Sequence, residues 1–204
     1  MRVNRTILLL TFSDITVLTG FGLIDPILAI FIAQDIVGGS VFTAGLASSI
    51  FLVTKSFAQL PFSLHIDRIS DHAKRWWLLA GTICVTVVPF LYIMANHVRM
   101  IFLAQFILGI GSGCAYSAWL GLWSRHLDKG HESFEWSLYS TLVGLGTAAA
   151  ATIGAAIANR YGFHAVMLGA GALSLVGCGI LFVLLTNRSP VHKPVPPVPA
   201  NKIR

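Results

Sequence analysis

Ionisable side chains lie inside the long apolar stretches of this sequence, where charge is costly. Asp14 and Asp25 fall in the first stretch, eleven residues apart, and Lys55 falls in the second with Gln59 four residues later. Eleven residues make close to three helical turns, so the two carboxylates share one helical face. An ionised group at mid-membrane costs at least ~2.5 kcal/mol, so these residues are expected to face one another or a wet cavity. They are the leading candidates for binding a substrate or an ion.

Two interpretations of these charges are open. In the functional one, Asp25 changes protonation as Lys55 moves within a substrate or proton site. In the structural one, the charges form a fixed buried ion pair, or Asp14 is solvated near the cytoplasmic interface. Antiparallel spans place Lys55 between the aspartates in depth, within several Å of either. Pro26 predicts a break in the helix at Asp25, which would leave backbone carbonyl groups facing a cavity. The alternative is that Pro26 only bends the helix for packing.

Six apolar stretches must position these side chains, and each is as long as a membrane span. A helix needs about 20 residues to cross about 30 Å of hydrocarbon. The stretches cover residues 7–32, 42–65, 76–95, 100–123, 134–158 and 163–186. With 55% hydrophobic and 11% charged residues and a mean hydropathy of +0.77, the 204 residues do not describe a soluble domain. The predicted fold is an all-α membrane protein with a six-helix transmembrane domain over residues 7–186.

Basic residues are distributed unevenly among the gaps between these stretches. Eleven of the 14 Lys and Arg residues lie before the first span, in the second and fourth gaps, or after the last span, and only Arg99 and Arg160 lie on the opposite side. Because such residues stay on the cytoplasmic side, both termini are predicted to be cytoplasmic, in a multi-pass protein of the plasma (inner) membrane. Residues 1–6 then form a cytoplasmic N-terminus, and the Pro-rich residues 187–204 a disordered cytoplasmic tail. The net charge of +6 is explained by this topology and by the lipid bilayer, not by nucleic acid.

Small residues recur at every fourth position in two later stretches. The fourth stretch has Gly109, Gly113, Ser117 and Gly121, and the fifth has Gly146, Ala150, Gly154 and Ala158. This spacing lets a neighbouring helix approach closely, so we interpret both stripes as helix-packing surfaces. Gln105, Tyr116 and Trp119 of the fourth stretch are further binding candidates, with packing as the competing interpretation.

The second gap carries a recognisable motif. Asp67 and Arg68 follow a span, and the basic residues Lys74 and Arg75 close a short cytoplasmic turn. This segment resembles the signature loop of the major facilitator superfamily, Gly-x-Leu-Ala-Asp-Arg-x-Gly-Arg-Arg, with serines in place of both glycines and an insertion around Asp71. The resemblance implies that these four charged residues form a cytoplasmic gating loop.

Two further segments extend the resemblance. Asp25-Pro26-Ile27-Leu28 is similar to the proline-containing first helix of the family, and Gln105 to Gly113 to its Arg-x-x-x-Gly-x-Gly segment in helix four. Gln105 takes the arginine position, and the antiporter glycine-proline motif is absent from Ala150 to Ala156. The sequence therefore does not decide whether transport is coupled to protons.

A member of this family normally has two six-helix halves around a central cavity. The resemblance implies that helices 1 and 4 line the cavity, helices 2 and 5 meet the other half, and helices 3 and 6 face lipid. This chain supplies one half of N-terminal type, so a parallel homodimer or a second six-helix half is expected to complete it. In the homodimer, helix 2 packs on the small stripe of helix 5 in the second copy. Asp67 then lies near the start of that helix, and Arg68 or Arg75 near Glu132 or Glu135.

Two functions compete at this stage. The first is a secondary active transporter, a permease that moves a small solute by alternating access, with solute, direction and coupling ion open. The second is a non-transporting membrane protein, either a truncated family member or a docking subunit of a membrane complex. An enzyme is not indicated, because the polar residues do not converge on a catalytic set. His126, His131, Glu132 and Glu135 suit interfacial charge pairing or helix capping rather than metal binding, so neither a metal nor a cofactor is predicted.

Overall fold

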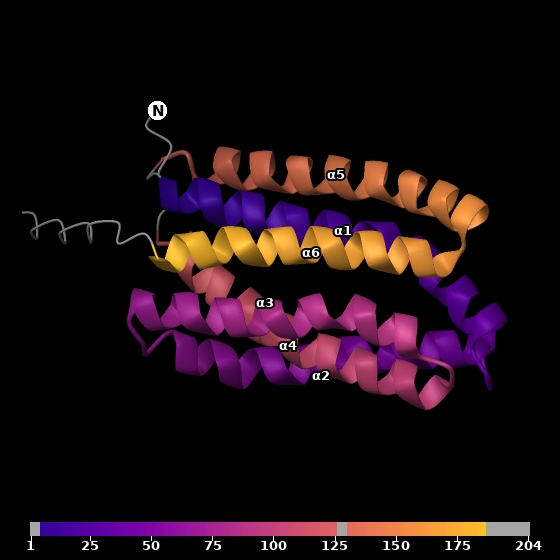
Figure 1. Cartoon of the computed structure of the whole chain (residues 1–204). Coiled ribbons are helices and arrows are strands. Elements are labelled where there is room, and N and C mark those ends of the chain that lie inside the picture. Colours follow the sequence, from indigo (N-terminus) through magenta and orange to yellow (C-terminus); the bar gives the residue numbers. More distant parts are fainter. Residues whose placement is uncertain (1–4, 126–129, 187–204) are drawn as a thin grey trace, which may run out of the picture.

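The computed structural model describes residues 5–125 and 130–186, which form six α-helices (Figure 1). The helices are α1 (Arg5–Asp35), α2 (Val41–Ile66), α3 (Asp71–Met94), α4 (Val98–Trp123), α5 (Glu132–Tyr161) and α6 (Phe163–Thr186). All six are long and apolar enough to cross a membrane, which confirms the predicted all-α, six-span fold. The Pro-rich tail predicted over residues 187–204 lies outside the described residues, as do residues 1–4 and the loop residues His126 and Lys129.

Two helices, α2 and α3, begin earlier than hydropathy predicts, and polar side chains cap the start of both. α3 starts at Asp71, five residues before the predicted start, and the Ser70 side chain accepts a hydrogen bond from the Ala73 N–H at 3.3 Å. At the start of α2, the Ser40 side chain accepts from the Thr43 N–H while the Thr43 side chain accepts from the Ser40 N–H. Such caps satisfy N–H groups that lack a partner within the helix. Membrane helices therefore extend into polar sequence that a hydropathy window excludes.

α1 runs without interruption from Arg5 to Asp35, so the predicted helix break at Asp25 is wrong. Pro26 removes one backbone hydrogen bond, but Ile24 and Ile27 on either side are buried in the core and hold the helix in place. α3 likewise continues through Pro89, which is itself buried.

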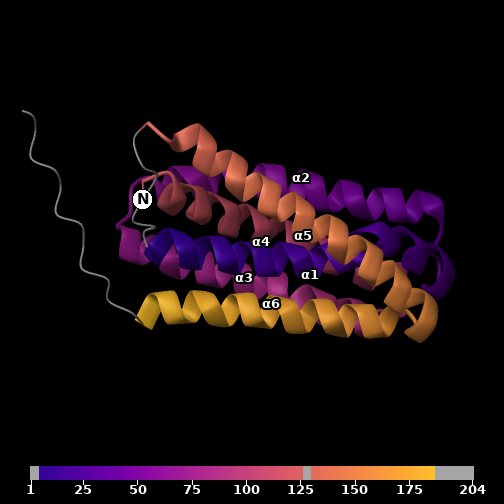
Figure 2. The same ribbon diagram turned by 90° about the horizontal axis from the view of Figure 1, so that it is seen from above.

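The helices form two groups of three. α1 packs against α5 and α6, and α4 packs against α2 and α3; the groups meet where α3 touches α6 and α1 touches α2. Figure 1 shows the first group above the second, with the chain alternating direction between successive helices. In the view from above, α6 and α2 lie toward opposite edges, with α1 and α4 between them (Figure 2).

Both stripes of small residues pack within the chain. On α4, a Cβ placed at Gly109 would lie 2.7 Å from the Thr54 Cβ of α2. On α5, a Cβ at Gly154 would overlap the backbone of Leu23 in α1. The α4 stripe thus lies against α2, and the α5 stripe lies against α1 of the same chain where a second copy was expected. Loss of the hydrophobic driving force in lipid makes such close backbone contacts the main source of helix affinity.

α4 also approaches α3 closely, on its other side. A Cβ at Gly81 of α3 would lie 2.8 Å from the Gly111 oxygen, and one at Gly111 would lie 3.0 Å from the Gly81 oxygen. The two backbones meet at a pair of facing glycines, so α3 and α4 are held at short range.

α2 and α5 are the least covered helices. Only 11% of the apolar window of each is buried, against 39–50% for the other four. Large apolar side chains such as Phe57 and Leu60 on α2, and Leu142 and Leu145 on α5, point out of the bundle. These two helices have wide faces for lipid or for another protein surface.

Candidate functional site

A cavity of about 560 Å³ lies among the helices, and α1 and α4 contribute more of its lining than any other helices. We call it the central cavity. Six of the seven predicted binding candidates line it: Asp14, Asp25, Lys55, Gln105, Tyr116 and Trp119. Gln59 is not among the lining residues; its backbone oxygen accepts a hydrogen bond from Ser117 at the α2–α4 contact. The structure thus gathers most of the candidates in one place, and their binding role stays a prediction.

Lys55 is held by aromatic rings rather than by a carboxylate. Its Nζ lies 5.8 Å from the centre of the Phe51 ring and 5.5 Å from that of Tyr116. Within residues 5–125 and 130–186, Lys55 forms no ion pair within 4.0 Å with either aspartate. The predicted fixed pair between Lys55 and Asp25 is therefore not formed. A cation over the negative face of a ring gains electrostatic energy, which explains how a half-buried ammonium is accommodated.

Asp14 is hydrogen-bonded across two helices. The Tyr139 hydroxyl of α5 donates a hydrogen bond to Asp14 Oδ2 of α1, and both residues are half-buried. Asp14 therefore has a partner within the chain, and its solvation near the cytoplasmic interface stays a prediction. The hydrogen bond from Tyr139 joins α1 and α5.

Asp25 has a different environment, farther along α1. It lines the central cavity, and its carboxylate forms no hydrogen bond or ion pair with another described residue. Gln105 and Tyr92 line the same cavity, and both are buried. The Oε1 atom of Gln105 and the hydroxyl of Tyr92 have no hydrogen-bond partner within the described part of the chain. Buried polar atoms are normally paired, so this part of the cavity has unused donors and acceptors.

Aromatic residues form a cluster beside Asp14. The rings of Trp119 and Trp123 stack at 5.2 Å, and Trp119 lies 4.9 Å from Tyr139. Trp136 completes the cluster, with its ring 5.2 Å from that of Trp123. Trp119 and Tyr139 also line the central cavity, so the cluster forms an aromatic wall at one end of it.

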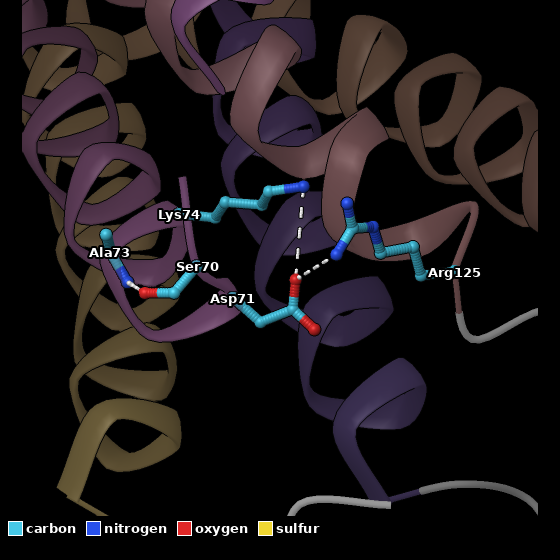
Figure 3. Close-up of polar contacts among 5 residues, drawn as sticks. All are labelled: Ser70, Asp71, Ala73, Lys74 and Arg125. Atoms are coloured by element: carbon cyan, nitrogen blue, oxygen red, sulfur yellow. Dashed lines mark hydrogen bonds and ion pairs between the residues drawn. The ribbon is translucent and has the colours of Figure 1, made fainter. Parts of the chain in front are cut away.

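An ion cluster lies at the end of the bundle where α3 begins (Figure 3). Arg125 Nη1 and Lys74 Nζ lie 3.0 Å and 3.9 Å from the same atom, Asp71 Oδ1. Lys74 is fully buried, whereas Asp67 and Arg68 of the predicted gating loop are exposed. Asp71, which breaks the family pattern in the sequence, is therefore the anion that holds the basic residues in place.

Tyr139, Tyr92, Asp71 and Arg125 were not among the predicted site residues. For Tyr139 the signal was depth: Asp14 lies nine residues after the start of α1, and Tyr139 seven after the start of α5. At about 1.5 Å per residue these positions differ by only about 3 Å along the membrane normal. No comparable signal in the sequence pairs Asp71 with Arg125, because each lies next to other charged residues.

Comparisons with known proteins agree with this geometry. The family model of the Major Facilitator Superfamily matches residues 10–203. The chain is similar to the in meso crystal structure of the POT family transporter PepTSo, with a TM-score of 0.75 and 16% sequence identity. The match covers 90% of this chain and 38% of that transporter chain, so the chain spans well under half of its length. No curated protein sequence matches the chain. At this identity the structural likeness shows the fold alone.

Proposed function

The chain belongs to the Major Facilitator Superfamily, and on this premise we propose that it acts as one half of a secondary active transporter. Two copies assemble into a twelve-helix carrier that moves a small solute by rocking around a central site. The central cavity carries this proposal, because it gathers Asp14, Asp25 and Lys55 within a membrane domain. Each charge costs at least ~2.5 kcal/mol at mid-membrane, a cost that packing alone does not require.

The second copy is proposed to cover α2 and α5. These helices bury only 11% of their apolar windows, which leaves wide apolar faces that a second copy can cover. In a parallel dimer with its axis along the membrane normal, α2 of one copy faces α5 of the other. The outer face of α5 makes this contact, because its small residues already pack on α1. The central cavities of the two copies then face each other.

In the proposed topology, the protein lies in the plasma membrane and both of its termini are in the cytoplasm. The distribution of Lys and Arg supports this orientation, and it places the Asp71 ion cluster on the cytoplasmic side. Asp67 and Arg68 then form a cytoplasmic loop between α2 and α3, beside the same ion cluster.

Cysteine crosslinking tests the dimer. Leu52 of α2 and Leu145 of α5 are exposed, and they lie 14 and 13 residues from the cytoplasmic ends of their helices. After replacement of Cys84, Cys114 and Cys178, Leu52→Cys and Leu145→Cys copies should crosslink in membranes. Ile83→Cys with Leu175→Cys is the matched control, because these residues are as exposed but lie on α3 and α6. Equal crosslinking of both pairs, or of neither, contradicts the α2–α5 interface.

Flux into proteoliposomes tests the carrier. Asp25→Asn and Lys55→Met should abolish flux of a solute that the unmodified protein moves, while elution in gel filtration stays unchanged. Asp35→Asn is the matched control, because Asp35 ends the same helix and does not line the cavity. Stable insertion without flux of any solute in a broad panel would favour the alternative, a non-transporting subunit of a membrane complex.

A further inference from the structure

We propose that the central cavity binds a monovalent hydrophobic organic cation, and that Lys55 is a built-in competitor which the cation displaces from its aromatic rings. The proposal names the substrate class of the carrier and in that respect rests on the proposed function. Binding itself needs neither the dimer nor transport.

The charged residues that line the central cavity favour a ligand with a positive charge. Asp14, Asp25 and Lys55 are the charged residues that line the cavity, so two carboxylates face one ammonium. Asp14 already accepts a hydrogen bond from Tyr139, and Lys55 is paired with neither aspartate. Asp25 is left as the carboxylate whose charge has no direct partner among the described residues. A single positive charge on the ligand balances the lining, whereas an anion would raise its imbalance.

Lys55 shows how the cavity holds a cation. Its Nζ lies within 6 Å of the Phe51 and Tyr116 ring centres, the range of a cation–π contact. The rings therefore form a cation site that the protein fills with its own ammonium. This contact is a weak one, on the order of 0.5–1 kcal/mol when partly exposed. A ligand that brings its own apolar groups can displace it.

One unused polar atom, Oε1 of Gln105, lies on a residue about 6 Å in depth from Asp25. Val37 after α1 and His97 before α4 pair through their backbones, so the outer ends of these helices are level. Counted from that pair, Asp25 is 12 residues into α1 and Gln105 is 8 residues into α4. At about 1.5 Å per residue their depths differ by about 6 Å. The unpaired Oε1 of buried Gln105 is an acceptor for an N–H group of the ligand.

The rest of the cavity fits the apolar part of such a compound. Its volume of about 560 Å³ falls within the range of small-molecule sites. Phe21, Leu28 and Leu108 give it apolar walls, and Trp119 closes the end beside Asp14. A small inorganic cation would leave most of this surface uncovered.

The test is binding of two probes of the same shape and opposite charge, tetraphenylphosphonium and tetraphenylborate, to the full chain in detergent by isothermal titration calorimetry. Empty micelles serve as the blank. Tetraphenylphosphonium should bind and tetraphenylborate should not. Asp25→Asn should weaken cation binding about tenfold, as expected for a partly solvated charge pair. Asp35→Asn should leave it unchanged.

Lys55→Gln gives the sharper outcome, because a misfolded protein cannot mimic it. Removal of the competing ammonium should tighten tetraphenylphosphonium binding by about two- to fivefold, the equivalent of one exposed cation–π contact. Equal binding of both probes, no binding of the cation, or unchanged or weaker cation binding by Lys55→Gln would overturn the proposal. Cation binding without flux would contradict the carrier alone, whereas flux of another solute without cation binding would contradict this inference alone.

Discussion

The hydroxyl of Tyr139 on α5 donates a hydrogen bond to the carboxylate of Asp14 on α1. The two helices start on the same side of the membrane, so this bond ties them together at one end of the central cavity. We expect Tyr139→Phe to lower the free energy of unfolding by about 1–2 kcal/mol, because it leaves a half-buried carboxylate without its donor. Unfolding in mixed micelles, followed by circular dichroism, measures this change.

Tyr116→Phe is the matched control for that change, since Tyr116 lines the same cavity and its hydroxyl forms no hydrogen bond with another described residue. Asp14→Asn in the Tyr139→Phe background should add little further loss, because the two residues act as one pair. Equal losses for the two tyrosine variants would show that Asp14 does not depend on Tyr139.

The contact between α5 and α1 depends on the absence of a side chain at Gly154. An added Cβ would overlap the backbone of Leu23, which cannot move without shifting α1. We expect Gly154→Ala to destabilise the protein by about 1–3 kcal/mol through overpacking. Gly144→Ala, on the same helix with open space around its Cβ, should leave stability unchanged or slightly higher. Thermal unfolding of both variants in detergent measures the two changes in stability, and equal changes would contradict the close contact at Gly154.

Substitutions in the ion cluster around Asp71 should lower the stability of the protein by unequal amounts. Asp71→Asn removes the carboxylate nearest to the fully buried Lys74, whereas Arg125→Ala leaves that contact in place. The Arg125 and Asp71 side chains are 52% and 41% exposed, so Arg125→Ala should cost only about 0–1 kcal/mol. Asp71→Asn should cost clearly more, in unfolding titrations at low and high salt. A larger loss for Arg125→Ala would mean that Lys74 is stabilised by other groups.

Gln105 is expected to lower the stability of the protein slightly and to strengthen ligand binding. Its side-chain oxygen is buried without a partner, so Gln105→Leu removes an unpaired polar group and should leave stability unchanged or raise it by up to about 1 kcal/mol. The same variant should weaken binding of a protonated hydrophobic amine, whose N–H group can donate to the Gln105 oxygen, and should leave binding of tetraphenylphosphonium, which has no N–H group, unaffected. Gln59→Leu, outside the cavity, should not weaken binding of the amine. Unfolding and calorimetry on the same preparations separate the two effects.

The fold was predictable because its main determinant is local. Each span is set by a run of apolar residues, and the motif around Asp67 and Arg68 indicated the family and so a six-helix half of its fold. The ends of α3 and α5 were less predictable, since they extend into polar residues: Ser70 caps α3, while Glu132 and Glu135 fall in the first turn of α5. Hydropathy excludes such residues even where a helix includes them.

The site was only partly predictable, for a different reason. Rise per residue placed Lys55 between Asp14 and Asp25 in depth, but the rotation of each helix about its axis is set by packing with its neighbours. Lys55 therefore lies over aromatic rings instead of beside an aspartate, and the small stripe of α5 faces α1 instead of a second copy. Both outcomes depend on contacts between helices that no periodicity within one helix contains.

The facing glycines Gly81 and Gly111 constrain how this family of sequences can change over time. Each backbone occupies the space that a methyl group on the other would need, so a substitution at either position separates α3 from α4. A larger residue at one position is tolerable only after the partner helix has moved, and that movement alters the cavity side of α4, where Gln105 and Tyr116 lie. Under the proposed transport function, substitution of either glycine should therefore change the shape of the central cavity and with it the preference for a solute.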